Sequence, residues 1–164
     1  MIKMIVCADA HGGIGSNNDL LYNIPDDMKF FRETTLNHKI VMGYNTWLSL
    51  PKKPLPKREN YVLYDGEETI EGAHVLKSLD EVIELGKTDD IFIIGGAMVY
   101  NEMIKNDLID EAYITIVNDI CYSADRHIDI FEVGRNLNHI EVLKKISFQH
   151  YFKEVDAIIC KFYR

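Results

Sequence analysis

Short apolar runs rich in β-branched residues recur along the chain and alternate with segments of helical periodicity. The apolar runs predict strands at 2–8, 39–42, 60–64, 91–94, 112–117, 146–152 and 157–163. Helices are expected at 25–35, 45–50, 79–86 and 97–105, with Gly86 ending the third. Strands that alternate with helices in this way indicate an α/β layer fold with a largely parallel sheet.

The last two predicted strands break this alternation. Only Glu154, Val155 and Asp156 separate them, which is too short for a crossover helix. We therefore expect an antiparallel hairpin that places one antiparallel strand in the sheet. No repeat or low-complexity tract divides the chain, and the proline-rich segment 51–56 is expected to be a stiff surface loop. The sequence thus predicts one domain over residues 1–164.

Composition and charge narrow the class of protein. With 26 acidic and 18 basic side chains the net charge is −8, which argues against nucleic acid or an anionic membrane as main partner. No apolar run approaches the ~20 residues that span a bilayer, and no signal-peptide pattern is present, so a cytoplasmic protein is expected. The spacing of the cysteines and histidines suggests neither disulfides nor a metal site.

The start of the first predicted helix carries the strongest candidate for chemistry. Pro25 suits a first helical turn, and Asp26 and Asp27 follow it. Residues four apart share a helix face, so Asp27 points inward with Phe31 while Asp26 points outward. Two such acids also complement the helix dipole without any further role. A carboxylate walled by aromatic side chains is poorly solvated, which makes Asp27 a candidate proton handler or ligand anchor.

Glycines follow two of the buried strands and precede helices. Gly95 and Gly96 follow the strand at 91–94, and Gly43 follows the strand at 39–42. Backbone N–H groups at such helix starts can receive phosphate, and the carboxyl edge of an open α/β sheet is where ligands bind. The two turns together suit a pyrophosphate, although a single glycine between a strand and a helix is usually just a helix cap.

A third glycine-rich segment follows the first strand. Gly12, Gly13 and Gly15 do not have the spacing of the G-x-G-x-x-G fingerprint, and Asn17 and Asn18 favour turns instead. We interpret residues 12–21 as a mobile loop that closes over a ligand.

These motifs, in this order and spacing, resemble the dihydrofolate reductase family. The resemblance covers nearly the whole chain and is carried by Gly13-Ile14-Gly15, Ile24-Pro25-Asp26-Asp27 with Phe31, Thr34-Thr35-Leu36-Asn37, Met42-Gly43 with Thr46-Trp47, residues 54–60, Ile93-Ile94-Gly95-Gly96-Ala97 with Val99-Tyr100, and Tyr113-Ile114-Thr115. It implies a single-domain α/β fold with a predominantly parallel eight-stranded sheet, an antiparallel C-terminal strand and four flanking helices. It also implies NADPH-dependent reduction of 7,8-dihydrofolate to tetrahydrofolate in one-carbon metabolism, by a cytoplasmic monomer that antifolates inhibit.

The resemblance assigns roles to particular residues. Asp27 would hold the pterin 2-amino group and N3, backed by Thr115, while a water carries the proton to N5. Tyr22 stands where the family usually has tryptophan and is expected, with Asp27, in the catalytic set because it orders that water. Arg58 would hold the α-carboxylate of the substrate's glutamate. The other expected substrate contacts are Ile5, Met28, Phe31, Arg32, Leu50, Leu55 and Ile94. Ordinary core packing or a solvated arginine also accounts for each of these residues separately.

The expected cofactor contacts follow the strand ends. They are Cys7, Ile14, Gly15, Leu20, Asn45, Thr46, Tyr64, Lys77, Gly95, Gly96, Ala97, Met98, Val99 and Tyr100. The family commonly grips the 2′-phosphate with an arginine and hydroxyl or basic residues at the positions of Tyr44, Tyr64 and Asp65 here. Two donors are missing and one acid is added, which predicts NADPH as cofactor with weakened discrimination against NADH.

Two other classes remain open at this point. The related reductase domain of riboflavin synthesis shares the fold and cofactor but would not need the Asp27 helix with Phe31. A non-catalytic nucleotide-binding protein would keep the glycine turns and could dispense with Asp27 and Arg58.

Overall fold

The computed structural model describes all residues from 1 to 164. Its strands are β1 (Ile2–Ala8), β2 (Gly13–Gly15), β3 (Lys39–Gly43), β4 (Glu59–Leu63), β5 (His74–Leu76), β6 (Ile91–Gly95), β7 (Glu111–Val117), β8 (Arg126–His127), β9 (His139–His150) and β10 (Lys153–Tyr163). Its helices are α1 (Pro25–Thr35), α2 (Tyr44–Ser49), α3 (Leu79–Thr88), α4 (Ala97–Lys105) and α5 (Ile130–Asn136). No helix has the combination of length and apolar character that a membrane span requires.

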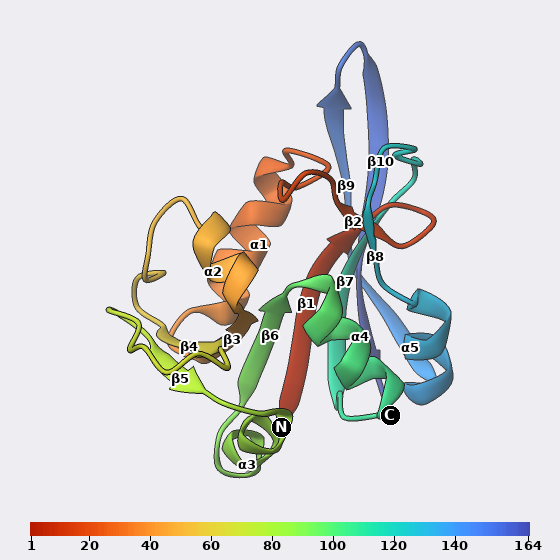
Figure 1. The fold of residues 1–164 in the computed structure, drawn as a ribbon. Helices are drawn as coiled ribbons and strands as arrows, with labels where there is room; N and C mark the ends of the chain where they lie inside the picture. The colour runs from red at the N-terminus through yellow and green to blue at the C-terminus, as the bar shows by residue number, and fades with distance from the viewer.

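Eight strands form one sheet in the order β5-β4-β3-β6-β1-β7-β10-β9 (Figure 1). The pairs from β5 to β7 are parallel, and β10 is antiparallel to both β7 and β9. The prediction of a mainly parallel sheet with an antiparallel C-terminal strand is confirmed. Strands β2 and β8 form a separate small ribbon beside the sheet.

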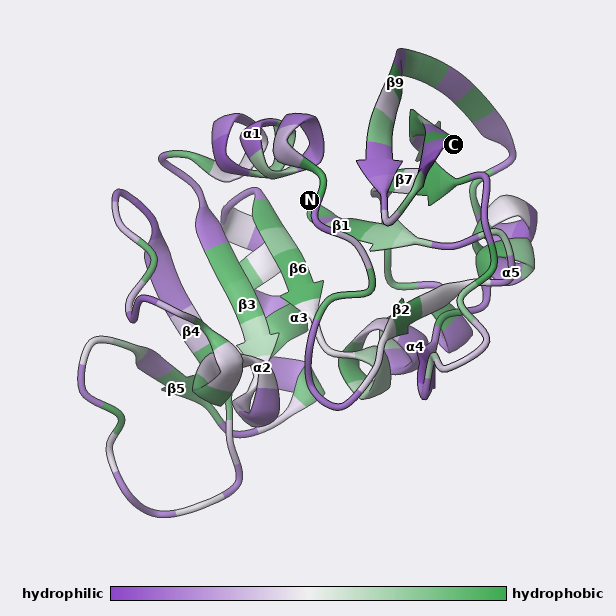
Figure 2. Cartoon of the chain, turned by 90° about the horizontal axis from the view of Figure 1, so that it is seen from above, coloured by the Kyte–Doolittle hydropathy of each residue, from purple (hydrophilic) through white to green (hydrophobic).

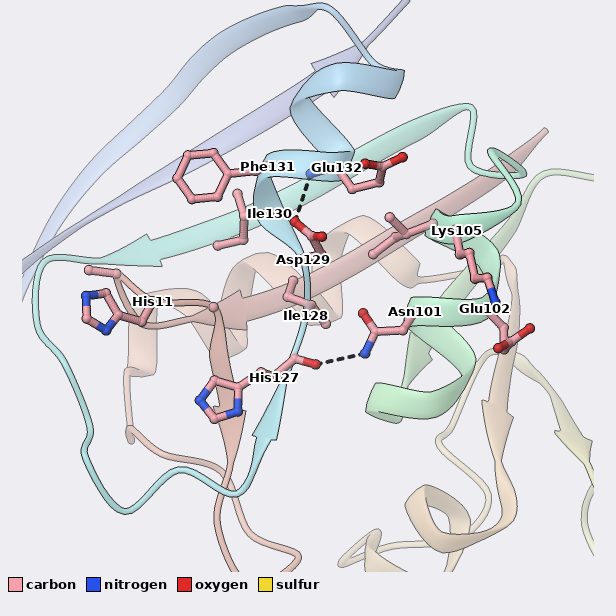
Figure 3. Close-up of a pocket in the computed structure, with 13 residues that line it drawn as sticks. His11, Asn101, Glu102, Lys105, His127, Ile128, Asp129, Ile130, Phe131 and Glu132 are labelled. Carbon is pink, nitrogen blue, oxygen red and sulfur yellow. Dashed lines mark hydrogen bonds between the residues drawn. The ribbon is translucent and has the colours of Figure 1, made fainter.

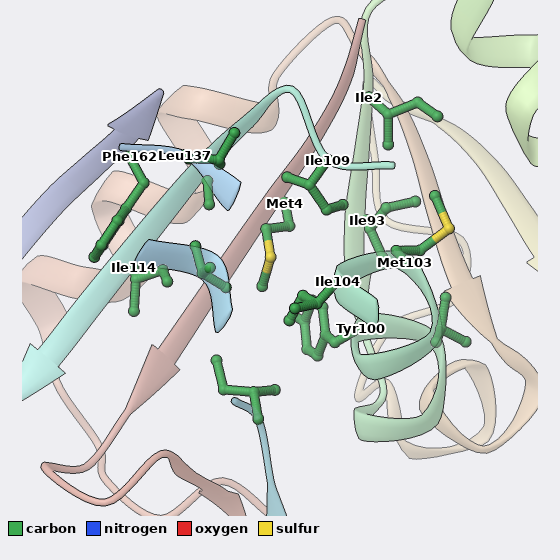
Figure 4. Packing of buried hydrophobic residues seen from close by; sticks show 14 of the residues in the cluster. Ile2, Met4, Ile93, Tyr100, Met103, Ile104, Ile109, Ile114, Leu137 and Phe162 are labelled. Atoms are coloured by element: carbon green, nitrogen blue, oxygen red, sulfur yellow. The ribbon is translucent and has the colours of Figure 1, made fainter. Parts of the chain in front are cut away.

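Helices cover both faces of the sheet, as Figures 1 and 2 show. The alternation of side chains along β1 supplies both layers, because Met4 points to one face and Ile5 to the other. Met4 packs with Tyr100 of α4 in the cluster that lies under α3, α4 and α5 (Figure 4). Ile5 packs with Trp47 of α2 and with the aromatic side chains of α1. The central strands are apolar along most of their length, as buried parallel strands must be.

The structure has five helices, so the expectation of four helices is wrong: α5 is the additional one. Asp129 caps this helix by accepting a hydrogen bond from Glu132 N at 2.9 Å. The helix is only seven residues long and contains Gly134, so its periodicity is too short to stand out in the sequence. Packing of Val133 in the core under α4 and α5 stabilises it instead.

The C-terminal hairpin turns earlier than expected. β9 ends at His150 and β10 begins at Lys153, so Tyr151 and Phe152 form the connection instead of residues 154–156. Val155 pairs with Phe148 and is buried, which extends the inward alternation of β10 back through the expected connection. The acidic residues on either side of Val155 are exposed on the other face of the strand, and they gave the segment the composition of a loop.

Gly86 does not end α3, which continues to Thr88. A Cβ atom on Gly86 would lie 2.4 Å from Cγ1 of Ile2. The glycine therefore allows close packing of α3 on the sheet and is not a stop signal. The short strands β2, β5 and β8 were also not predicted, because two or three residues carry no measurable periodicity.

Candidate active site

The carboxylate of Asp27 lies against the sheet beneath α1. The Thr115 hydroxyl, on β7, donates a hydrogen bond to Asp27 Oδ1 at 2.5 Å. Thr115 is paired in register with Cys7 of β1, so the Cys7 thiol shares this environment. Asp26 is exposed, whereas Asp27 is half-buried, as the helical spacing predicts. Two adjacent strands and one helix therefore build a small polar site in an otherwise apolar layer.

Burial determines the ionisation of this site. It raises the pKa of Asp27, and the hydrogen bonds from Thr115 and the Cys7 thiol oppose the rise without cancelling it. Burial, with the nearby charge of Asp27, also raises the pKa of Cys7, so the thiol stays protonated. Asp27 is thus a carboxylate whose proton affinity exceeds that of a solvated side chain, which is the property expected of a group that favours a protonated ligand.

Most of the expected apolar substrate contacts gather under α1 and α2. Ile5 is buried in this cluster, and partly buried side chains pack against it: Phe31, Leu50, Leu55 and Ile94. Met28 does not join them, since it is 54% exposed. The structure therefore brings together an apolar wall beside Asp27 from segments that are far apart in the sequence.

Arg58 and Arg32 lie close enough for their charges to interact at the end of α1. Arg58 Nε donates to the Pro56 carbonyl at 2.9 Å, and Nη1 donates to Thr35 Oγ1 at 3.1 Å. Partial burial, followed by the charge of Arg32, lowers the pKa of Arg58. Burial and the neighbouring charge both destabilise the Arg58 cation when it has no counter-ion. An anion that binds beside Arg58 is therefore stabilised. These two hydrogen bonds, one to a carbonyl and one to a hydroxyl, hold the Arg58 side chain in one orientation before any ligand arrives.

The two glycine turns converge at the carboxyl ends of the adjacent strands β3 and β6. A Cβ on Gly43 would lie 3.8 Å from Gly96 N, and one on Gly95 would lie 3.0 Å from Thr46 Oγ1. Gly95 has φ +146°, and the Gly95–Gly96 peptide bond is cis. These close approaches leave open backbone beside the N-termini of α2 and α4, where an anion is favoured. The geometry fits the phosphates of a dinucleotide.

The other residues expected to contact the cofactor differ in burial and in their distance from this edge of the sheet. Val99 lies 3.2 Å from the Cβ position of Gly43, while Asn45 and Met98 are exposed. Tyr100 is buried and its hydroxyl donates to the Ile5 carbonyl at 2.7 Å, which ties α4 to β1. Further contacts expected on the basis of sequence are placed as follows: Ala97 begins α4, Ile14 and Gly15 lie in β2, and Leu20 is exposed ahead of α1.

The comparisons with known proteins agree with this site. The family model for dihydrofolate reductase matches residues 1–150. The chain belongs to the dihydrofolate reductase family. It is 32% identical to dihydrofolate reductase from Ureaplasma parvum over 153 residues, covering 92% of this chain and 96% of that protein. It is 33% identical to the Bacillus subtilis enzyme over 134 residues, covering 80% of this chain and 77% of that protein.

A solved structure of the same family shares the fold. It is described as dihydrofolate reductase from Enterococcus faecalis complexed with NADP(H) and RAB-propyl, and it superposes with a TM-score of 0.78 at 24% sequence identity. The superposition covers 99% of this chain and 95% of that one.

Tyr22 of this reductase makes a hydrogen bond that was not part of its expected catalytic role. Its hydroxyl donates to Asp119 Oδ2 at 3.0 Å, so the phenol proton is held by a carboxylate other than Asp27. No local sequence pattern identifies this partner, because 97 positions separate the two residues.

Asp9 is a second residue that the sequence reasoning missed. It is 1% exposed and accepts hydrogen bonds from the backbone N–H groups of His11, Gly13 and Cys121 at 2.8 to 2.9 Å. Its place immediately after the first strand was the available signal. Asp9 fixes the start of the reductase loop at 12–21, which Asp125 also holds by accepting from Asn17 N at 3.0 Å.

The adenosine end expected for a reductase of this family is occupied by aromatic side chains. Tyr44 stacks on Tyr64 with ring centroids 4.4 Å apart, and the Tyr64 hydroxyl donates to Glu68 at 2.6 Å. That hydrogen bond raises the pKa of Tyr64 to about 12. Lys77 donates to the Gly66 carbonyl, and its ammonium lies 5.9 Å from the centroid of the Tyr64 ring. Lys39 is paired with Glu59 and Asp89, at the opposite end of β3.

A separate cavity of 1050 Å³ lies between α4 and α5, on the face of the sheet opposite α1 (Figure 3). His11, Asn101, His127 and Phe131 are among its lining residues. Asn101 donates to the His127 carbonyl at 2.9 Å across one side of it. None of the residues expected to bind substrate or cofactor lines this cavity.

Proposed function

We propose that this protein catalyses the reaction of its family, the NADPH-dependent reduction of 7,8-dihydrofolate to 5,6,7,8-tetrahydrofolate. The observation that carries this proposal is the half-buried Asp27 carboxylate with its Thr115 hydrogen bond, set beside an apolar wall and near two open glycine turns. A fold alone hosts many activities, so the argument depends on this site. Residues 1–164 act as one reductase domain, because β10 lies between β7 and β9 and completes the sheet beyond the matched region.

Asp27 favours the reactive form of the substrate. Its carboxylate accepts hydrogen bonds from the pterin 2-amino group and N3, and its raised proton affinity draws a proton toward the ring system. Water delivers that proton to N5. Thr115 and the Cys7 thiol orient the carboxylate, so little of its freedom remains to be lost on binding.

When bound, the dinucleotide would supply the hydride for C6. Backbone N–H groups at the starts of α2 and α4 would hold its pyrophosphate between the glycine turns, because they provide positive charge there. A side chain at Gly95 or Gly96 would fill this space, since its Cβ would lie 3.0 to 3.1 Å from Thr46 Oγ1. The residues present therefore fit the cofactor.

Arg58 binds the far end of the substrate. Its two-pronged guanidinium matches the α-carboxylate of the glutamate, with Arg32 adding charge beside it. Phe31, Leu50 and Leu55 cover the aromatic ring between the pterin and this carboxylate. The substrate thus spans the length of α1, with the reacting ring at Asp27 and the anionic tail at Arg58.

Absorbance measurement of NADPH oxidation tests the proposal. Purified protein should oxidise NADPH when dihydrofolate is supplied and should not do so with a phosphorylated ribosylaminopyrimidine, the substrate class of the related riboflavin reductases. An antifolate that mimics the protonated pterin should inhibit competitively with dihydrofolate. No oxidation with dihydrofolate, at saturating concentrations of both reactants, rejects the function.

We also propose that the protein works in the cytoplasm as a monomer. The net charge of −8, which disfavours an anionic membrane surface as partner, supports this setting. Sedimentation of the purified protein tests the oligomeric state, and a dimer at working concentration would contradict it.

A further inference from the structure

Tyr22 links three parts of the molecule that converge ahead of α1. It lies two residues before Ile24, the residue that precedes α1, and five before Asp27. Its hydroxyl donates to Asp119 Oδ2 at 3.0 Å in the loop after β7. The other oxygen of Asp119 accepts from Lys153 Nζ at 2.9 Å, at the first residue of β10. One carboxylate therefore joins the catalytic helix, the loop after β7 and the C-terminal hairpin.

Packing fixes the ring of Tyr22 as firmly as the hydrogen bond fixes its hydroxyl. Tyr22 is 7% exposed and contacts Phe148 edge-on, with the His150 ring centroid 4.9 Å away. Both partners lie on β9, on the hairpin that projects at the top of Figure 1. Burial of the phenol raises the pKa of Tyr22, and the hydrogen bond from Lys153 lowers the pKa of Asp119. The phenol is thus the donor and the carboxylate the acceptor near neutral pH.

The acceptor is itself anchored to the centre of the sheet. Ala10 N donates to the Asp119 carbonyl at 2.9 Å, directly after β1. Cys121 N donates to the buried Asp9 carboxylate at 2.9 Å. The loop carrying Asp119 is therefore held on both sides to the end of β1, the strand that also carries Cys7 beside Asp27.

We propose that Tyr22, Asp119 and Lys153 are positioning residues, which hold the start of α1 and thereby fix the Asp27 carboxylate against Thr115. In this role they act through the backbone between Tyr22 and Asp27. Loss of the Tyr22 hydroxyl frees the segment ahead of α1 from the loop after β7, and Asp27 then samples orientations in which the pterin is not held. This inference rests on the proposed function, because its main measurement is dihydrofolate reduction.

A double-mutant cycle tests the network. Tyr22→Phe removes only the hydroxyl, and Asp119→Ala removes its acceptor. Each should lower kcat/KM for dihydrofolate about tenfold, and the double variant should lose about tenfold and not a hundredfold, because both changes break one interaction. Lys153→Met should have a smaller effect, since its ammonium is more exposed than the carboxylate. The KM for NADPH should change less than about twofold, because the glycine turns lie on other strands.

Ser147→Ala is the matched control. It removes a 2.7 Å hydrogen bond to Asp156 within the same hairpin and should leave both kinetic constants unchanged. Independent losses in the double variant, or equal losses toward dihydrofolate and NADPH, would show that these residues stabilise the fold generally and do not position Asp27.

Limited proteolysis supplies a measurement that does not depend on activity. Chymotrypsin should cut at the exposed Leu20 and the partly buried Leu21 several times faster in Tyr22→Phe than in the wild type or Ser147→Ala, at temperatures where all three remain folded by circular dichroism. Unchanged cleavage overturns the proposed network. A wild type that does not reduce dihydrofolate would reject the proposed function instead, and the cleavage rates would still report on the tether.

Discussion

The chemistry of the site depends on one side chain whose surroundings set its proton affinity. Asp26 and Asp27 are adjacent and chemically identical, yet only Asp27 meets Thr115 and the apolar layer under α1. Desolvation raises the pKa of a carboxyl group, and two neutral donors limit the rise. The difference between the two acids therefore comes from helical spacing followed by burial.

Replacing Asp27 tests its part in the reaction. Asp27→Asn should lower kcat/KM for dihydrofolate about 100-fold at neutral pH and recover part of the loss as the pH falls, because acid can protonate the substrate from solution. Asp26→Asn serves as the control and should stay within about twofold. A loss that is equal at all pH values, measured by steady-state kinetics, would be incompatible with this role.

The same substitution should affect stability in the opposite direction. The folded state raises the pKa of Asp27, so folded protein binds this proton more tightly than unfolded chain. The stability gained from the protonated carboxyl is fully present below the unfolded pKa and is lost as the pH rises through the folded pKa. Urea unfolding should therefore show Asp27→Asn gaining stability relative to the wild type between acid and neutral pH. A difference that does not vary with pH would mean that Asp27 titrates normally.

Arg58 is expected to act on binding instead of on the chemical step. A substrate carboxylate at Arg58 would be held similarly in the ground and transition states, so Arg58→Leu should raise the KM for dihydrofolate by about tenfold or more with a much smaller change in kcat. The control is a substrate fragment without the glutamate, which should react equally well with both proteins. A similar loss with the fragment would place the carboxylate elsewhere.

At the scale of elements, the proposed cofactor site is formed by the starts of helices that follow parallel strands. The strands β3 and β6 are neighbours, so Gly43 and Gly95 end side by side although 52 positions separate them in the sequence. Close approach of Thr46 then makes glycine necessary at this turn. Gly134 in α5 has no such requirement, since nothing lies within 4 Å of its Cβ position.

Two glycine substitutions test the difference between Gly95, where a side chain has no room, and Gly134, where it has room. Gly95→Ala should weaken NADPH binding by about tenfold or more and lower stability, since its φ of +146° and the nearby Thr46 leave no room for a side chain. Gly134→Ala should instead raise stability by ~0.5–1 kcal/mol, because alanine favours a helix over glycine. Thermal unfolding and cofactor titration measure both effects. Unchanged NADPH affinity in Gly95→Ala would mean that the phosphates bind elsewhere.

At the scale of the whole molecule, segments far apart in the sequence meet where the adenosine of the cofactor is expected. Tyr44 of α2 stacks on Tyr64 after β4, and Lys77 after β5 lies over the same ring. We therefore expect Lys77 to be the base that meets a 2′-phosphate. Lys39 is not expected there, because its ion pairs hold it at the other end of β3. The exposed Asp65 beside Tyr64 opposes a dianionic group.

Cofactor preference follows from this arrangement. The ratio of kcat/KM for NADPH to that for NADH should fall below a thousandfold, which is about 4 kcal/mol. Tyr44→Arg should raise the ratio and Lys77→Met should lower it, because each changes one cationic donor near the 2′ position. Tyr61→Phe, farther down β4, provides a control that leaves the ratio unchanged. A ratio above a thousandfold in the wild type would show that another basic group replaces the missing arginine, and it would contradict this interpretation of Tyr44 and Asp65.

The sequence by itself determined the layered sheet, the antiparallel C-terminal strand and the inward face of Asp27, because these follow from periodicity and from spacing along one helix. It also indicated the two glycine turns, since glycine between a strand and a helix is visible locally. Only the tertiary structure decided which distant groups meet. No local pattern encodes contacts between residues that are far apart in the sequence. Examples are Tyr22 with Asp119, Asp9 with Cys121, and Gly86 with Ile2. The helix α5 and the true turn of the hairpin likewise depend on burial of Val133 and Val155 against partners far away in the chain.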